Sequence, residues 1–232
     1  YRLDLSTKEF SLIKEIPGDA SIEGNIYHYN KEKKVSELIG FRQMPGYIVD
    51  TFLNEEHPGA VIRNSLKEAF TGHIVDIVNT TRDGKKSLVR AWNDRNPGTY
   101  YLLDNDSNSV EYLLDSIPWL NPEQLAPMEP FAFNARDGLE IRGYLTRPIG
   151  KKKNLPMIVY VHGGPYGPKD SWGYERDTQF LANRGYAVLQ VNYRGSGGRG
   201  SAFQYDAYRQ MGAEMQDDLT DATLWAIKEG IA

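Results

Sequence analysis

A short apolar run that ends in a glycine loop limits the folds open to this chain of 232 residues. Residues Ile158 to Val161 are β-branched or aromatic, and His162, Gly163 and Gly164 follow them directly. The run predicts a buried parallel strand, and its glycines predict a loop that bends sharply and brings its backbone close to another group. A strand followed by a simple glycine turn would show the same pattern, so the neighbouring segments must decide.

Helical and strand patterns alternate after this loop. The predicted order is helix, strand, glycine loop and helix, over residues 174–184, 186–193, 194–200 and 214–229. Asp170 and Ser171 are N-cap candidates for the first of these helices, and Gly185 is placed to end it. Strand, helix, strand and helix in this order predict a parallel sheet with right-handed crossovers.

Three motifs in this half of the chain occur together. They are His162-Gly-Gly-Pro165, the run from Phe180 to Ser196, and Gln216-Asp-Asp-Leu-Thr-Asp-Ala222 followed by Trp225. From about Pro130 onward, the chain thereby resembles the catalytic domain of the prolyl oligopeptidase family of serine peptidases, and most of all its acylaminoacyl-peptidase branch. The resemblance implies the first half of an α/β-hydrolase sheet, whose His-Gly-Gly loop after the third strand supplies an oxyanion-hole donor.

The serine nucleophile of such a fold is not found in this sequence. The elbow Gly-x-Ser-x-Gly is absent, and Gly195-Ser196-Gly197 lacks the spacing because Arg194 stands where the first glycine should be. In this fold the triad follows the order Ser, Asp, His. The resemblance therefore implies that all three lie downstream of Ala232 and that the chain alone is inactive.

Three residues of the glycine loop are the candidates for chemistry. Gly164 is the first, because the resemblance places its backbone N–H at the substrate oxyanion. His162 stands where other branches of the family carry an oxyanion-binding tyrosine, and we expect it to hold the loop by a hydrogen bond rather than to act as the general base. Tyr166 follows the loop and could line the substrate cleft or simply pack.

Short strands with tight turns fill the first half of the chain. The clearest series runs over residues 73–80, 86–92, 99–103 and 109–114, and a helical excursion is expected within 54–70. An antiparallel sandwich fits this spacing, but the turns resemble propeller blades of the same peptidase family. We therefore expect part of a β-propeller over residues 1–116, a proline-rich linker over 117–130 and the incomplete hydrolase domain over 131–232.

The composition limits the kinds of partner and cofactor expected for this chain. The formal net charge of −4 gives no electrostatic reason to expect a nucleic acid or an anionic membrane as partner. The absence of cysteine excludes disulfides and thiolate metal sites, and no His-x-x-x-His pair suggests a metal, so no cofactor is expected. His28, His57 and His73 are interpreted as surface or packing residues. The compartment, cytoplasmic or periplasmic, stays open.

Two other functions remain open. One is a non-catalytic half-molecule that associates, with itself or with a partner chain, through the sheet edge exposed at the strand 158–161. The other is a lipase or esterase, since those enzymes carry similar His-Gly-Gly-Gly loops. The expected substrate of the parent protein is a short peptide.

Overall fold

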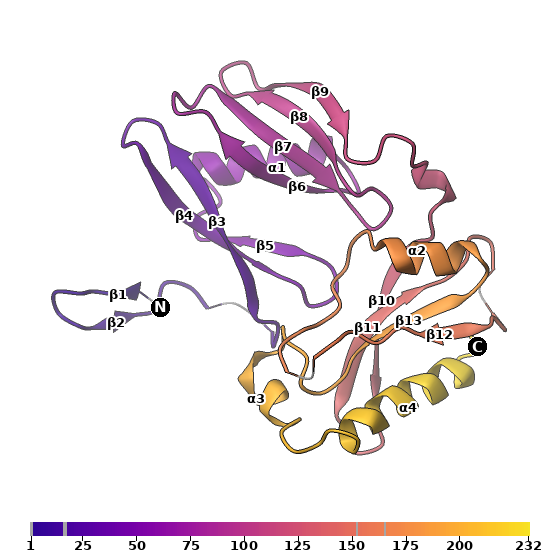
Figure 1. The fold of residues 1–232 in the computed structure, drawn as a ribbon. Helices are drawn as coiled ribbons and strands as arrows, with labels where there is room; N and C mark the ends of the chain where they lie inside the picture. Colours follow the sequence, from indigo (N-terminus) through magenta and orange to yellow (C-terminus); the bar gives the residue numbers. More distant parts are fainter. Residues whose placement is uncertain (1, 16–17, 152, 165) are drawn as a thin grey trace.

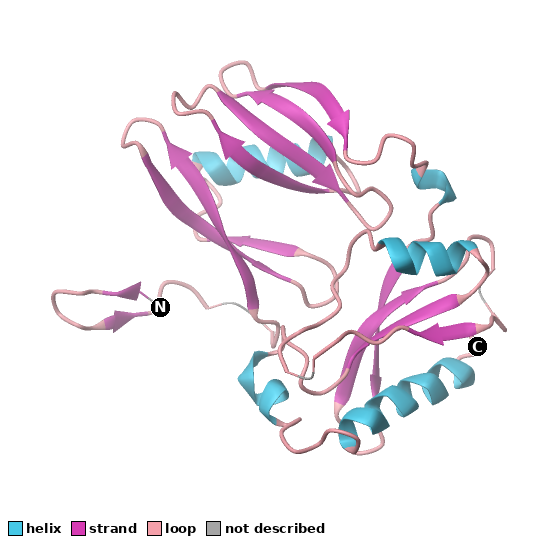
Figure 2. Cartoon of the chain, in the orientation of Figure 1, coloured by secondary structure: helices cyan, strands magenta, loops and turns pink. Residues whose placement is uncertain are grey.

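A computed structural model gives the fold of the chain and describes residues 2–15, 18–151, 153–164 and 166–232. Three sheets and a small hairpin follow one another along the described residues, and the helices lie mostly in the second half (Figures 1 and 2). The hairpin pairs β1 (Arg2–Leu3) with β2 (Phe10–Ser11) and projects away from the rest of the structure in Figure 1. Among all the described residues, no helix combines the length and the apolar character that crossing a bilayer requires.

The first of the three sheets is antiparallel. Its strands are β3 (Ile22–Asn30), β4 (Val35–Gln43) and β5 (Val49–Phe52), in that order. The helix α1 (Pro58–Ala69) follows, which confirms the helical excursion expected between the strands. His57 caps α1, because its Nδ1 accepts the Gly59 N–H at 3.1 Å. The side chain of Leu66 on this helix reaches the core of the next sheet.

The second sheet is a four-stranded antiparallel meander. Its strands β6 (Ile74–Thr80), β7 (Lys86–Trp92), β8 (Thr99–Asp104) and β9 (Ser109–Asp115) lie side by side in chain order. The strands and turns predicted from the alternation are thus confirmed to within a residue or two. Val75, Val89 and Leu103 form its core with Leu66, whereas β9 is an exposed edge strand.

The proline-rich segment after β9 contains the short 3-10 helix η1 (Pro122–Gln124), and the next strand already begins at Met128, inside the range expected for the linker. This segment is fastened rather than free. The buried side chain of Gln179 accepts the Ala126 N–H at 2.9 Å and donates to the carbonyl oxygens of Ala126 and Asp94, at 2.7 and 3.2 Å.

The third sheet is mixed and has the strand order β10-β11-β13-β12. β10 (Met128–Asn134), β11 (Glu140–Thr146) and β13 (Ala187–Asn192) pair antiparallel, and β12 (Met157–Val159) pairs parallel with β13. The prediction that the segments near 158–161 and 187–191 lie parallel in one sheet is confirmed. Within the described sheet, β12 forms the edge.

Helices cover both faces of this sheet (Figure 1). α4 (Glu214–Lys228) packs Met215, Ala222 and Ala226 into the main core, on the side of Leu189 and Val191. α2 (Arg176–Asn183) lies on the opposite side, where the hydroxyl of Thr178 meets Gln190 at 3.4 Å. A short helix, α3 (Gly200–Tyr205), follows the glycine loop after β13.

The ends of α2 explain one success and one error of the sequence interpretation. Gly185, with φ of +94°, ends α2 as expected, because its N–H bonds Ala182 O while the Tyr186 N–H bonds Leu181 O. Asp170 and Ser171 were wrong as N-caps. The N-cap is Glu175, whose carboxylate accepts the Thr178 N–H at 2.5 Å.

Residues near the start of the first sheet meet the third sheet through a charged interface, formed by Asp19, Glu23, Arg142, Lys169 and Arg199. Asp19 pairs with Arg142 at 2.8 Å and with Arg199 at 3.1 Å, and Lys169 pairs with Glu23. Next to these pairs, the Ser21 N–H donates to Gly198 O at 2.8 Å. The two regions are therefore joined by contacts between residues more than a hundred positions apart.

Candidate active site

The glycine loop leaves the carboxyl end of β12, at the edge where open α/β sheets place their ligand sites. Tyr160 still continues the pairing, since its N–H donates to Leu189 O at 2.9 Å. His162 is partly buried beyond that point, while Gly163 and Gly164 are exposed. Pro165, part of the motif on which the resemblance rests, lies outside the described residues.

His162 fixes this loop from two sides. Its Nδ1 lies 2.8 Å from the carbonyl oxygen of Gly163, and its Nε2 lies 2.9 Å from the hydroxyl of Ser196. A carbonyl oxygen only accepts, so Nδ1 carries a proton, and in the neutral ring Nε2 accepts from Ser196. The ring also stacks on Tyr193, with centroids 4.6 Å apart and planes at 12°. These contacts agree with the expected loop-holding role.

Gly164 presents a free backbone donor. Among the described residues, no acceptor pairs with its N–H. Because the peptide unit is planar and trans, the Gly163 carbonyl and the Gly164 N–H point in opposite directions. His162 holds that carbonyl, so it also directs the Gly164 N–H away from the imidazole ring.

The need for glycine at position 164 does not come from the local backbone. Its φ lies outside the positive range, and an added Cβ would meet Tyr166 N and Tyr193 Oη at 3.4 Å, which is ordinary contact. Gly197 on the neighbouring loop differs, because a Cβ there would lie 2.3 Å from Gly167 O. Within the described chain, close approach therefore requires glycine at 197 and not at 164.

The glycine loop after β13 supports the first loop. Gly167 and Ser196 form an isolated parallel bridge, in which the Gly167 N–H donates to Gly195 O at 3.0 Å. Ser196 is fully buried, so its hydroxyl faces His162 and not a substrate. Ser196 thus holds the glycine loop after β12 from a position 34 residues away.

Asp170 lies beneath the same loop. The Asp170 N–H donates to Asn192 Oδ1 at 2.8 Å, and the Asp170 carbonyl oxygen accepts from Asn192 Nδ2 at 3.0 Å. The side-chain Oδ1 of Asp170 accepts from Gln190 Nε2 at 2.9 Å. Burial raises the pKa of this carboxyl above its usual range, and Oδ2 has no partner among the described residues. Asp170 therefore anchors the segment after the loop on β13, which explains why it does not cap α2.

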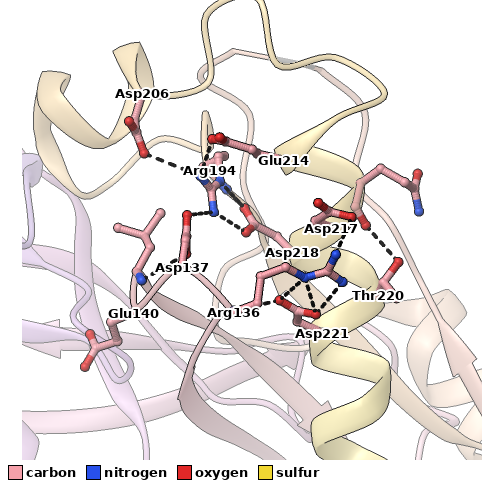
Figure 3. A network of polar contacts seen from close by, with 12 residues as sticks. Arg136, Asp137, Glu140, Arg194, Asp206, Glu214, Asp217, Asp218, Thr220 and Asp221 are labelled. Atoms are coloured by element: carbon pink, nitrogen blue, oxygen red, sulfur yellow. Dashed lines mark hydrogen bonds and ion pairs between the residues drawn. The ribbon is translucent and has the colours of Figure 1, made fainter.

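Arg194 is the centre of a buried ionic network at the start of the second loop (Figure 3). The buried carboxylate of Asp218 accepts its Nε at 2.9 Å, its Nη2 at 2.8 Å and its backbone N–H at 2.8 Å. Asp137 and Glu214 add contacts at 2.7 and 2.5 Å. Arg194 thus fastens the loop to α4 and to the β10–β11 turn.

A second network lies beside it on α4. Arg136 binds Asp221 through its Nε and Nη2, at 3.0 and 2.7 Å, and Asp217 through Nη1 at 3.0 Å (Figure 3). The hydrogen bond from Arg136 holds the pKa of Asp221 below its usual range.

A cleft of about 480 Å³ lies between the second sheet and the segment that follows the glycine loop after β12. Arg90, Trp92 and Pro97 line one side, and residues 169–175 with Gln190 line the other. Its size is within the range of small-molecule sites. Asp170 lines this cleft and belongs to the anchored segment, so the cleft adjoins the glycine loop.

The remaining candidates have structural contacts. Tyr166 is 36% exposed and packs edge-on against Tyr208, with ring centroids 4.8 Å apart. His28 and His57 pack edge to face at 5.4 Å, and His73 is partly exposed at the start of β6. Over the described ranges, no group of three or more His, Cys, Asp or Glu residues is arranged to hold a metal ion.

The third sheet, with helices on both faces and a glycine loop at the carboxyl end of its parallel edge strand, defines a protein of the α/β class. Residues 172–232 match the profile of the prolyl oligopeptidase family. The chain belongs to this family of serine peptidases.

Curated relatives carry peptidase names. Dipeptidyl aminopeptidase BIII of Pseudoxanthomonas mexicana is 38% identical over 163 residues, which cover 66% of this chain and 24% of that protein. Dipeptidyl peptidase family member 6 of Caenorhabditis elegans is 32% identical over 180 residues, covering 68% and 24%. The chain thus spans about a quarter of the length of these relatives.

A solved structure supports the fold over a larger part of the chain. The acylaminoacyl peptidase of Pyrococcus horikoshii superposes with a TM-score of 0.55, covering 90% of this chain and 31% of that one at 20% identity. At this identity the likeness concerns the fold alone. It shows that the arrangement of sheets described above occurs in a peptidase of this family.

Proposed function

We propose that this chain is part of a serine peptidase that hydrolyses short peptides, and that its glycine loop supplies one donor of the oxyanion hole. The observation that carries the proposal is the free N–H of Gly164, held in direction by His162 at the carboxyl end of β12. The peptidase names of the relatives favour peptides over the esters of a lipase.

The reaction is acyl transfer. A serine hydroxyl attacks the peptide carbonyl, a histidine takes the hydroxyl proton and returns it to the leaving amine, and an aspartate orients that histidine. As the carbonyl carbon becomes tetrahedral, its oxygen gains negative charge, and a fixed N–H donor stabilises that charge more than it stabilises bound substrate. Gly164 performs this last task in our proposal.

The nucleophile and its partners come from residues beyond the 232 of this chain. No Gly-x-Ser-x-Gly occurs in the sequence, and the only serine seen bonded to a histidine in the described part, Ser196, is buried. The family order of Ser, Asp and His supports positions after Ala232. The isolated chain should accordingly be inactive.

We assign the remaining segments by the same resemblance to the prolyl oligopeptidase family. Residues 1–116 form part of a β-propeller, 117–130 the connection, and 131–232 the first half of the hydrolase domain. The four-stranded meander β6–β9 supports the propeller, since each blade of a propeller is such a sheet. The cleft between β7 and residues 169–175 gives the substrate a place between the two regions.

The edge strand β12 supports the proposal that the isolated chain associates with itself or with a partner chain. Its outer side is unpaired in the described sheet, and Val161 just beyond it is 46% exposed. Unpaired strand edges recruit other strands. Sedimentation of the isolated chain should show dimers or larger species, and a monomer at high concentration would contradict this.

A fluorophosphonate probe tests the proposed function, because it labels only an activated serine. The full-length protein should be labelled at a serine outside this chain, and the isolated 232-residue chain should stay unlabelled. Circular dichroism controls for folding of both samples. Stoichiometric labelling at Ser171, Ser196 or Ser201 would place the nucleophile inside this chain and refute the assignment.

A further inference from the structure

Three exposed tyrosines stand next to the oxyanion loop and have no role in the chemistry derived above. Tyr166, Tyr205 and Tyr208, here called the tyrosine cluster, are 36%, 58% and 50% exposed. Tyr208 lies in the centre, with its ring 4.8 Å from Tyr166 and 5.2 Å from Tyr205. Within the described ranges their hydroxyls have no hydrogen-bond partner, and the rings contact one another directly.

The contact between the two glycine loops places this cluster close to the candidate site. The bridge between Gly167 and Ser196 joins the two glycine loops, and α3 begins four residues after Ser196. On α3, the side-chain nitrogen of Gln204 lies 3.8 Å from the Cβ position of Gly167, so this helix packs against the end of the first loop. Tyr205 is the last residue of α3.

The cluster begins with Tyr166, two residues after the proposed oxyanion donor Gly164. The backbone nitrogen of Tyr166 lies 3.4 Å from the Cβ position of Gly164. An extended peptide advances about 3.3 Å per residue. Two residues of chain span at most about 7 Å, so the Cα atom of Tyr166 is no further from Gly164 than the length of two residues of an extended substrate.

We propose that the tyrosine cluster is a substrate subsite that binds an aromatic or large apolar side chain of the peptide close to the cleaved bond. The inference rests on the proposed function. Single exposed aromatic residues are ordinary on protein surfaces, whereas contiguous ones mark binding sites. In an edge-to-face pair such as Tyr166 and Tyr208, one ring keeps both of its faces clear of its partner, so a further aromatic ring can stack there while the hydroxyls stay in water.

The test compares matched peptides on the full-length protein. Substrates that differ only in Phe or Ala, at the residue on either side of the cleaved bond, are measured with wild type, Tyr208→Ala and Tyr205→Ala. At one of the two positions, kcat/KM for the Phe peptide should fall about tenfold while the Ala peptide changes little. Tyr208→Phe should keep the preference, because the ring and not the hydroxyl makes the contact.

Tyr186→Ala is the matched control. Tyr186 is 38% exposed and precedes β13 at the opposite end of that strand, so its removal should leave the preference unchanged. Equal losses for the Phe and Ala peptides, or no loss for either, would overturn the subsite.

Binding without catalysis separates the subsite from the proposed function. Calorimetric titration with N-acetyl-phenylalanine amide should show affinity about tenfold weaker for Tyr208→Ala than for wild type. Unchanged affinity would refute the subsite, even in a protein that the fluorophosphonate probe labels. A weakened affinity in a protein that the probe does not label would support the subsite and count against the peptidase.

Discussion

Replacement of Gly164 by valine in the full-length protein should reduce kcat strongly. A Cβ at this position already stands 3.4 Å from Tyr166 N and Tyr193 Oη and 3.8 Å from Pro168 Cδ. Two γ-methyl groups reach about 1.5 Å further. Valine therefore forces the loop to shift and misplaces the Gly164 N–H, and loss of one such donor costs about 10²–10³ in kcat, or roughly 2.7–4 kcal/mol.

Alanine at the same position is the matched control. Its single methyl group fits at ordinary contact distance, and the backbone conformation of Gly164 suits any residue. Gly164→Ala should therefore keep most of kcat, while both variants show native circular dichroism. The contrast between alanine and valine separates the position of the N–H from the mere presence of a side chain.

Steady-state kinetics with a short peptide substrate give the answer. The loss in Gly164→Val should appear mainly in kcat, with KM changed less, because the donor acts on charge that develops only in the transition state. His162→Ala removes the bond to Gly163 O but not the donor, so its loss should be milder. A folded Gly164→Val protein with near-native kcat would refute the oxyanion-hole assignment.

Two further predictions concern stability. Asp218→Ala should lower the free energy of unfolding in urea by about 3–5 kcal/mol, because it leaves the buried Arg194 guanidinium without its main partner. Asp217→Ala, at an exposed ion pair, should lower it by about 0–1 kcal/mol. Equal losses of stability in the two variants would contradict the buried network. The pKa of Asp221 is held below its ordinary value by Arg136, so its contribution is present above about pH 4 and is lost as the pH falls below that value. The stability difference between wild type and Asp221→Asn should therefore shrink as the pH is lowered from about 4 through the folded-state pKa of Asp221, and a difference that does not change with pH would contradict it.

Local patterns predicted the strands well, because neighbouring residues determine them. β7 has the bounds expected from its alternation, and the turn before it contains Gly84 with φ of +71°. Gly185 ends α2 by the same local logic. The alternation of strands and helices predicted a parallel sheet, and the resemblance of several motifs taken together implied that it belongs to a hydrolase fold.

Contacts between distant residues explain what the sequence could not show. Asp170 has the local sequence pattern of a helix cap, yet it accepts hydrogen bonds from Gln190 and Asn192 on β13 instead. Ser196 looked like a failed nucleophile elbow, and its bond to His162 depends on two loops that meet only in the folded chain. Gly164 and His162 could be proposed from the sequence because their motif is continuous.

The charged interface of Asp19, Glu23, Arg142, Lys169 and Arg199 bears on how a substrate could reach the loop. Any motion that separates the first sheet from the third sheet must pull these opposite charges apart. Dissolved ions weaken attraction over distances beyond about 10 Å at 0.1 M salt, so they lower the energy of the separated state more than that of the closed one. Higher ionic strength should therefore lower the free-energy cost of any such separation.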